Sequence, residues 1–181
     1  MLPSAGSAKG NEMQRAVSPS SEPRIAVNGI HHVALSVPDM DIARRFYVGI
    51  LGFEEISSGA WTDIPEMDRI IGLRGSAGKS AMIRAANTYI ELFEYSSPAP
   101  PPRSGPPEAN TLGYTHICFD VSDADATYEQ LREHGFSFMS EPQSRAGVRT
   151  VYGRDPFGNI IEFQQIMTEG IVRRLPPTGT Q

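Results

Sequence analysis

The chain is poor in the residue types that several classes of protein depend on. It has a single cysteine, Cys118, so it can form no internal disulfide, and any metal site must be built from histidines and carboxylates. It contains no stretch of about 18 apolar residues that could span a bilayer. Its net charge of −5, without any run of Lys or Arg, argues against a nucleic-acid-binding surface.

The same scarcity bears on where the protein works. A lone thiol fits a reducing compartment, and the first residues, MLPSAGSAKGNEMQR, lack the apolar segment of a secretory signal. The content of 39% hydrophobic and 20% charged residues is typical of a soluble globular protein. We therefore expect a cytoplasmic protein.

Three stretches show no hydrophobic periodicity. Residues 1–27 are expected to be a disordered leader, and residues 167–181 a loose tail. Residues 96–111 hold six prolines in sixteen positions, which excludes a helix or a central strand and predicts a linker. The folded part is then a single domain over residues 28–166, made of segments 28–95 and 112–166.

These two segments resemble each other. The first opens with GIHHVALSVPDMDIARRFYVGILGF and the second with GYTHICFDVSDADATYEQLREHGF. A shift of 84 residues superposes His32 on His116, Val37 on Val121, Asp39 on Asp123 and Asp41 on Asp125. Each segment predicts a strand, an acidic helix cap, an amphipathic helix (residues 41–51 in the first) and further strands. The pattern predicts an α+β fold of two βαβββ modules.

Strand parity selects four polar residues. Side chains alternate between the two faces of a strand, so His32 lies opposite the apolar positions of its strand, and Glu91 does the same in TYIELFEY. His116 and Glu162 occupy the corresponding places in the second module. Any one of them alone is more simply a solvated side chain. As a repeated pair they predict a site for one divalent ion, with Zn, Ni, Co, Mn and Fe(II) all compatible.

The chain also resembles the vicinal oxygen chelate superfamily, which includes glyoxalases, bleomycin-resistance proteins, epimerases and dioxygenases. The resemblance lies in HHVALSVPDMDIARRFYVGILGF, YIELFEY, GYTHICFDVSD and YGRDPFGNIIEF, and it spans nearly all of residues 28–166. It implies paired βαβββ modules that form a curved mixed sheet around a metal. The implied ligands are His32, Glu91, His116 and Glu162, a set similar to those of glyoxalase I and metal-dependent epimerases.

The resemblance further implies a lyase or isomerase that removes a proton next to a metal-chelated carbonyl group. By analogy with glyoxalase I the catalytic base is a ligand glutamate, Glu162 or Glu91, and we favour Glu162. Two alternatives remain open: a single-domain Fe(II) dioxygenase of extradiol type, and a metal-free small-molecule binding protein of the bleomycin-resistance type. A homodimer is expected, with the modules paired within one chain or across two.

The substrate pocket is predicted less directly. Phe93, Tyr89 and Tyr152 are candidates by their position, and Arg149 is a candidate for an anionic substrate. The first module has about thirteen more residues than the second between its His and its Glu. This extra length, within residues 57–80, includes Trp61 and suggests a lid or a pocket wall, with a surface excursion or a dimer contact as the alternative.

Overall fold

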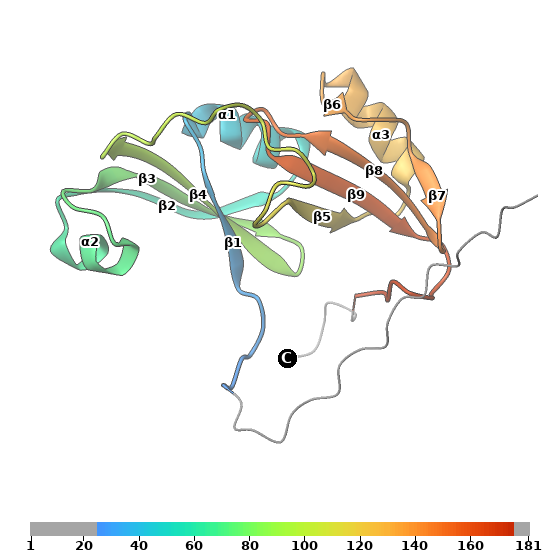
Figure 1. Ribbon diagram of the computed structural model, residues 1–181, viewed down its shortest axis with the longest axis horizontal. Helices are drawn as coiled ribbons and strands as arrows, with labels where there is room; N and C mark the ends of the chain where they lie inside the picture. The colour runs from blue at the N-terminus through green and yellow to red at the C-terminus, as the bar shows by residue number, and fades with distance from the viewer. Residues whose placement is uncertain (1–24, 176–181) are drawn as a thin grey trace, which may run out of the picture.

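The computed structural model describes residues 25–175 of the chain, and the expected leader lies almost entirely outside them. Each module has one sheet and one principal helical segment (Figure 1). The first contains β1 (His32–Ser36), α1 (Met40–Arg44), η1 (Arg45–Ile50), β2 (Glu54–Thr62), α2 (Pro65–Ile71), β3 (Ala77–Ala85) and β4 (Thr88–Ser97). The second contains β5 (His116–Asp120), α3 (Ala124–Glu133), β6 (Ser137–Phe138), β7 (Gln143–Arg145), β8 (Val148–Arg154) and β9 (Ile160–Ile166).

The two sheets have the same topology. Their strand orders are β1-β4-β3-β2 and β5-β9-β8-β6, with β7 also paired to β8. The first strand of each module runs parallel to the last strand, and the remaining pairs are antiparallel. The predicted α+β architecture of two βαβββ modules is confirmed. Within each module the strands form one mixed sheet.

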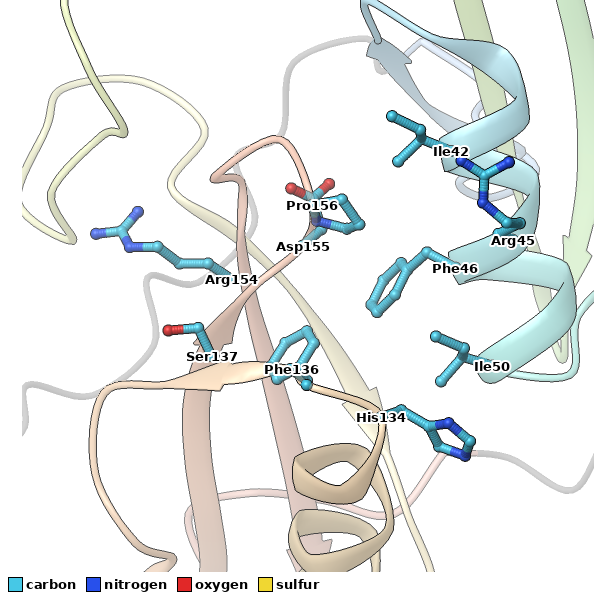
Figure 2. Close-up of a pocket in the computed structure, with 11 residues that line it drawn as sticks. Ile42, Arg45, Phe46, Ile50, His134, Phe136, Ser137, Arg154, Asp155 and Pro156 are labelled. Atoms are coloured by element: carbon cyan, nitrogen blue, oxygen red, sulfur yellow. The ribbon is translucent and has the colours of Figure 1, made fainter.

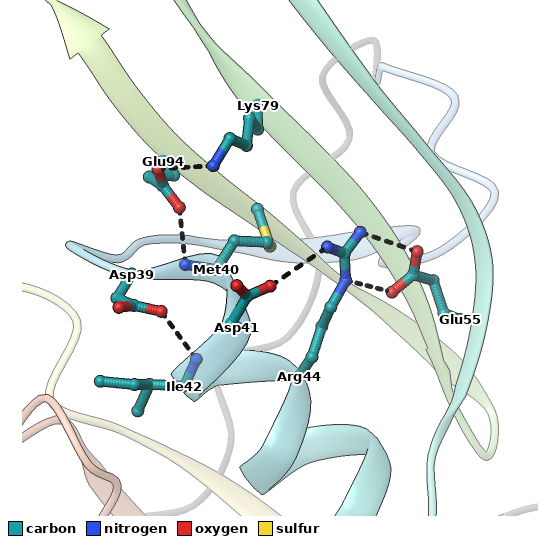
Figure 3. Close-up of polar contacts among 8 residues, drawn as sticks. All are labelled: Asp39, Met40, Asp41, Ile42, Arg44, Glu55, Lys79 and Glu94. Atoms are coloured by element: carbon teal, nitrogen blue, oxygen red, sulfur yellow. Dashed lines mark hydrogen bonds and ion pairs between the residues drawn. The ribbon is translucent and has the colours of Figure 1, made fainter.

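Both main helices begin in the same way. Asp39 accepts a hydrogen bond from the Ile42 amide at 2.8 Å, and Asp123 accepts one from the Ala126 amide at 3.0 Å, so each aspartate satisfies a free N–H of the first turn. A residue of the last strand caps the helix as well, and here the modules differ. Glu94 accepts from the Met40 amide at 2.7 Å (Figure 3), where Gln165 accepts from the Ala124 amide at 3.3 Å.

The first helix differs from its prediction. The spacing of Ile42, Phe46 and Ile50 predicted one regular helix over residues 41–51, but after Arg44 the chain continues as a π-helix to Ile50. The wider turn lets the adjacent residues Phe46 and Tyr47 both be buried. Ile42 and Ile50 are left half-buried at the edge of the core.

The modules share one core. Phe46 of η1 lies against Phe136, which precedes β6, with ring centroids 5.6 Å apart. The buried hydroxyl of Tyr47 donates to Asp155 at 2.8 Å, in the turn between β8 and β9. Burial raises the pKa of Tyr47 strongly, and the adjacent charge of Asp155 acts in the same direction. Because the Tyr47 hydroxyl stays protonated, it remains a hydrogen-bond donor to Asp155 in the other module.

The extra residues of the first module form the end of β2, the helix α2 and the start of β3 (Figure 1). The Pro-rich segment begins slightly later than predicted, because β4 continues to Ser97. It then packs on the β8–β9 turn, where Arg154 donates to the Pro107 carbonyl at 2.8 Å and Arg103 donates to Asn159 at 2.9 Å. None of the helices among the described residues is long and apolar enough to cross a membrane.

Candidate metal centre

The first module places His32 and Glu91 side by side. His32 is the first residue of β1 and pairs in register with Tyr89 of β4, so Glu91 is its diagonal neighbour on the same face. The His32 Nε2 atom lies 3.3 Å from the Glu91 Oε2 atom. The other ring nitrogen of His32 is 2.9 Å from the Nδ1 atom of His31. A contact on Nδ1 orients the ring and leaves Nε2 directed at the carboxylate.

The second module repeats this geometry. His116 begins β5 and pairs with Ile160, which makes Glu162 of β9 its diagonal neighbour. The His116 Nε2 atom lies 3.1 Å from the Glu162 Oε2 atom. Its Nδ1 atom is 2.9 Å from the hydroxyl of Thr115, the residue that precedes it, as His31 precedes His32. The two pairs therefore have the same register and expose the same atoms.

The surroundings of the two glutamates differ. Thr150 of β8 donates to the Glu162 Oε1 atom at 2.6 Å, and the side chain of Glu162 is 11% exposed, against 24% for Glu91. Tyr152 faces Glu162 in register and its hydroxyl is 3.4 Å from the His116 Nε2 atom. Partial burial raises the pKa of Tyr152 to about 12, and the negative charge of Glu162 adds to the effect. Glu162 is thus fixed more firmly than Glu91.

Each pair suits two adjacent positions around a divalent ion. Imidazole nitrogens and carboxylate oxygens bind such ions at about 2.1 Å, so two ligands at right angles are about 3.0 Å apart. The observed separations of 3.3 and 3.1 Å agree with this spacing. The donor types also suit the metals that the sequence indicates.

The four predicted ligands do not gather in one place. Within residues 25–175, no three His, Cys, Asp or Glu side chains come close enough together to hold one ion. The chain therefore presents two half-sites, His32–Glu91 and His116–Glu162, each with two donors.

The predicted pocket residues of the first module lie on the face of Glu91. Tyr89 precedes it by two positions and stacks on His31, with ring centroids 5.1 Å apart. Phe93 follows it by two positions, and Trp61 of β2 meets Phe93 edge to face at 5.9 Å. Trp61 is 7% exposed and is held by a hydrogen bond from its Nε1 atom to Ser76 at 3.0 Å. It forms part of a fixed surface beside the half-site.

The two pocket candidates of the second module separate. Tyr152 lies on the face of Glu162, with its ring centroid 4.9 Å from that of His116. Arg149 lies on the opposite face of β8, where its guanidinium donates to Asp125 of α3, with an Nη2–Oδ1 distance of 2.6 Å. Arg149 and Tyr152 are three positions apart on β8, and an odd separation puts two residues on opposite faces, since neighbouring strand positions alternate. Arg149 is therefore outside the surface that carries the half-site.

A cavity of about 420 Å³ lies elsewhere, on the helical side of the molecule (Figure 2). Its walls come from η1 and from the segment that joins α3 to β6, with Phe46, Phe136 and Ile50 as apolar members. None of the four half-site residues lines it.

Sequence interpretation missed three residues that contact or flank the half-sites. Thr150 and Thr115 hold Glu162 and His116, and Tyr95 stacks on Phe93 with centroids 5.7 Å apart. Parity could have indicated Tyr95, because it lies four positions after Glu91 on the same strand. Nothing in the sequence distinguishes the two threonines from other strand threonines.

Comparison with known proteins agrees with the fold. The model of the Glyoxalase/Bleomycin resistance protein/Dioxygenase superfamily matches residues 29–163. A 2-epi-5-epi-valiolone epimerase from Actinomyces sp. is 33% identical over 74% of this chain and 77% of its own length. An ethylmalonyl-CoA/methylmalonyl-CoA epimerase from Cereibacter sphaeroides is 28% identical over 77% of this chain and 99% of its own.

Solved structures give the same fold. A glyoxalase family protein from Bacillus cereus superposes with a TM-score of 0.73, at 22% identity, over 82% of this chain and all of the other. The resemblance found in the sequence is therefore confirmed by a family model that covers most of the folded region. The chain belongs to the Glyoxalase/Bleomycin resistance protein/Dioxygenase superfamily.

Proposed function

We propose that this protein is a divalent-metal-dependent isomerase or lyase, most simply an epimerase, that removes and returns a proton on a carbon next to a carbonyl group. The observation that carries the proposal is the repeated half-site. Within each module, one imidazole nitrogen and one carboxylate oxygen lie close together and face the same way. The two relatives named as epimerases support the reaction class.

His32, Glu91, His116 and Glu162 are the residues that would hold the ion. A bound divalent ion polarises a carbonyl oxygen, which makes the neighbouring C–H group more acidic. The protein then has to supply a base within reach of that proton.

Glu162 is suited to this role. Thr150 holds its Oε1 atom, which leaves Oε2 on the open face of the sheet. In the proposed reaction Oε2 moves away from its place beside His116 Nε2 and accepts the proton, while the C–H bonding pair moves toward the carbonyl. The proton on Glu162 exchanges with solvent. Delivery of a proton to the opposite face of the carbon then inverts its configuration, and delivery to the neighbouring carbon isomerises the substrate. Tyr152, beside His116, lies close enough to help orient the substrate's oxygens.

A homodimer is part of the proposal. The histidines of the half-sites lie on β1 and β5, each of which is an edge strand of its sheet, and the glutamates lie on the adjacent strands β4 and β9. Large apolar side chains flank both strands and are exposed, among them Ile30 (80%), Leu112 (99%) and Tyr114 (111%). A second copy that covers this surface could set the first module of one chain against the second module of the other and so complete two four-donor sites.

Metal content and deuterium exchange together test the reaction. The full chain is analysed for bound metals and then incubated in D₂O with methylmalonyl-CoA and with 2-epi-5-epi-valiolone, and deuterium uptake is followed by mass spectrometry. We expect about one Zn, Ni, Co or Mn per chain, and uptake on the carbon next to the carbonyl of at least one compound. Metal and uptake should both be lost in a His32→Ala/Glu162→Ala variant.

Other outcomes redirect the assignment. Bound iron with O₂ consumption on a catechol would favour the dioxygenase alternative. A chain that retains no metal after reconstitution would contradict metal-dependent catalysis and favour a binding protein.

Complementation tests the dimer. A His32→Ala variant and a His116→Ala variant should each be inactive alone, whether the site is shared between chains or lies within one. If the site is shared, half of the chains in a random mixture form mixed dimers with one intact site, so about a quarter of the activity returns. No recovery after denaturation and joint refolding would place each complete site within one chain.

A further inference from the structure

One side of the His32–Glu91 half-site is aromatic. Glu91, Phe93 and Tyr95 follow one another on the same face of β4, at a spacing of about 7 Å. Trp61 lies across the two rings, nearly perpendicular to each, with centroid distances of 5.9 Å to Phe93 and 5.5 Å to Tyr95. Phe93 and Tyr95 are themselves nearly parallel, with 25° between their planes. We call Trp61, Phe93 and Tyr95 together the aromatic shelf.

Contacts with Ser76 and Gly78 fix the position of Trp61 in the shelf. Trp61 donates to Ser76, which is fully buried, and Asp68 of α2 accepts hydrogen bonds from the amides of Ser76 at 2.9 Å and Gly75 at 2.6 Å. Gly78 lies so close to the indole that a Cβ atom there would be 2.7 Å from the Trp61 Cη2 atom. The extra residues of the first module thus fix the position of Trp61.

The strands beside Phe93 leave it accessible. Its register partners are Ser36 on β1 and Ser80 on β3, and Ser80 pairs in turn with Gly59 on β2. A Cβ atom added to Gly59 would meet nothing within 4 Å. Across four strands, Phe93 is therefore the one large side chain of its row, and it is half-buried. Tyr95 is half-buried too and pairs with Gly78, beyond which Trp61 lies in the same row.

The corresponding row of the second module is polar. Its members are Asp120, Gln164, Thr150 and Gln143. By the repeat, Gln164 occupies the place of Phe93, two positions after the glutamate. Only the first module therefore offers an apolar surface next to its half-site.

We propose that the aromatic shelf holds the body of the substrate, and that this body is an uncharged aliphatic ring or branched aliphatic group whose carbonyl end lies at the His32–Glu91 pair. The assignment rests on the proposed function and adds a substrate class to it. An aliphatic ring matches the length of about 7 Å from Glu91 to Phe93 and gains from apolar contact with both aromatic rings. A cation is a poorer match, because Trp61 is almost fully covered and the shelf does not enclose a charge from several sides.

Two hydroxamates test the shelf. Acetohydroxamate and cyclohexanecarbohydroxamate chelate a divalent ion through the same two oxygens and differ only in the body. On the full chain loaded with Co²⁺, the visible absorption of the ion reports binding, and the fluorescence of Trp61, the chain's only tryptophan, reports contact with the shelf. We expect the cyclohexyl compound to bind at least about tenfold more tightly and to shift the emission of Trp61, which acetohydroxamate should leave unchanged.

Substitutions test which residues are responsible for the preference for the cyclohexyl compound. Phe93→Ala and the milder Tyr95→Ser should reduce the preference for the cyclohexyl compound, by about tenfold and about threefold respectively, without weakening acetohydroxamate. Gln164→Ala, the matched position of the second module, should keep the preference. Equal affinities in the wild type, or a preference that Gln164→Ala lowers as much as Phe93→Ala does, would overturn the shelf and leave the metal site standing. If neither compound perturbs the Co²⁺ spectrum, the metal site fails and the shelf falls with it.

Discussion

The two modules share a backbone plan but differ on the faces that carry their His–Glu pairs. In the first module the glutamate is bounded by aromatic rings and its carboxylate contacts only His32 among the side-chain partners found in residues 25–175. In the second module the glutamate is bounded by hydroxyl, amide and phenol groups, and Thr150 fixes one of its oxygens. A repeated fold has kept the donor pair and changed its surroundings.

In this way a symmetric frame can serve an asymmetric reaction. Proton transfer needs one carboxylate that is held in a defined orientation, whereas recognition of a substrate body needs surface. The second module provides the oriented carboxylate and the first provides the surface. If the two roles are divided in this way, corresponding substitutions in the two modules should have unequal effects.

Corresponding substitutions of the two glutamates are expected to differ most in their effect on activity. Glu162→Gln removes the proposed base and should lower kcat about a thousandfold, because an amide cannot accept the proton. Glu91→Gln weakens only metal binding and should lower activity about tenfold when metal is in excess. Steady-state kinetics of the two variants, with metal content measured in the same samples, checks the comparison. Equal losses in kcat at equal metal content would mean that the modules contribute alike.

A second inequality concerns the contact between the modules. Tyr47 donates to Asp155 across the boundary, but the repeat places Leu131, an apolar residue, at the position equivalent to Tyr47. Tyr47→Phe should therefore destabilise the fold by about 1 to 2 kcal/mol, since it removes one donor from a buried carboxylate. Asp155 keeps its bonds to the Phe157 and Asn159 amides, which limits the loss. Urea unfolding measures the difference, and a variant as stable as the wild type would show that the bond adds nothing.

Much of this plan could be predicted from the sequence. The shift of 84 residues identified the repeat, and strand parity placed each histidine and its glutamate on the face away from the helix, because side-chain direction depends only on local backbone geometry. Another local rule predicted an acidic cap for each helix, at Asp39 or Asp41 and at Asp123 or Asp125, and the structure has the caps at Asp39 and Asp123. These features needed no knowledge of distant contacts.

The features that were missed depend on contacts between distant segments. The π-helix at Phe46 and Tyr47 follows from packing against Phe136 and Asp155, about a hundred residues away along the chain. Arg149 is an exception: it was a candidate for the pocket because of its charge, although strand parity alone puts it on the face opposite Tyr152, where its partner is Asp125 of α3. The separation of the half-sites was also beyond local rules, since it depends on how the modules are arranged.

The smallest inequality lies at the starts of the helices. Glu94 and Gln165 accept the same helix amide in the two modules, but only Glu94 titrates. The Met40 amide, and then Lys79, lower the pKa of Glu94 below its ordinary range. A carboxyl group with a lowered pKa stabilises the fold at pH values above the ordinary pKa of glutamate. This stabilisation is lost as the pH falls through the lowered pKa.

Replacing Glu94 by Gln gives the first module the cap of the second and should cost about 0.5 kcal/mol near neutral pH, because Gln still accepts the amide but carries no charge. The difference in Tm from the wild type should shrink as the pH falls below the ordinary glutamate range and through the lowered pKa of Glu94, where the carboxylate becomes protonated in the folded chain as well. Gln165→Glu is the converse change and should create the same pH dependence in the second module. A difference in Tm that is independent of pH would show that the charge of Glu94 does not contribute, and that the two caps are equivalent.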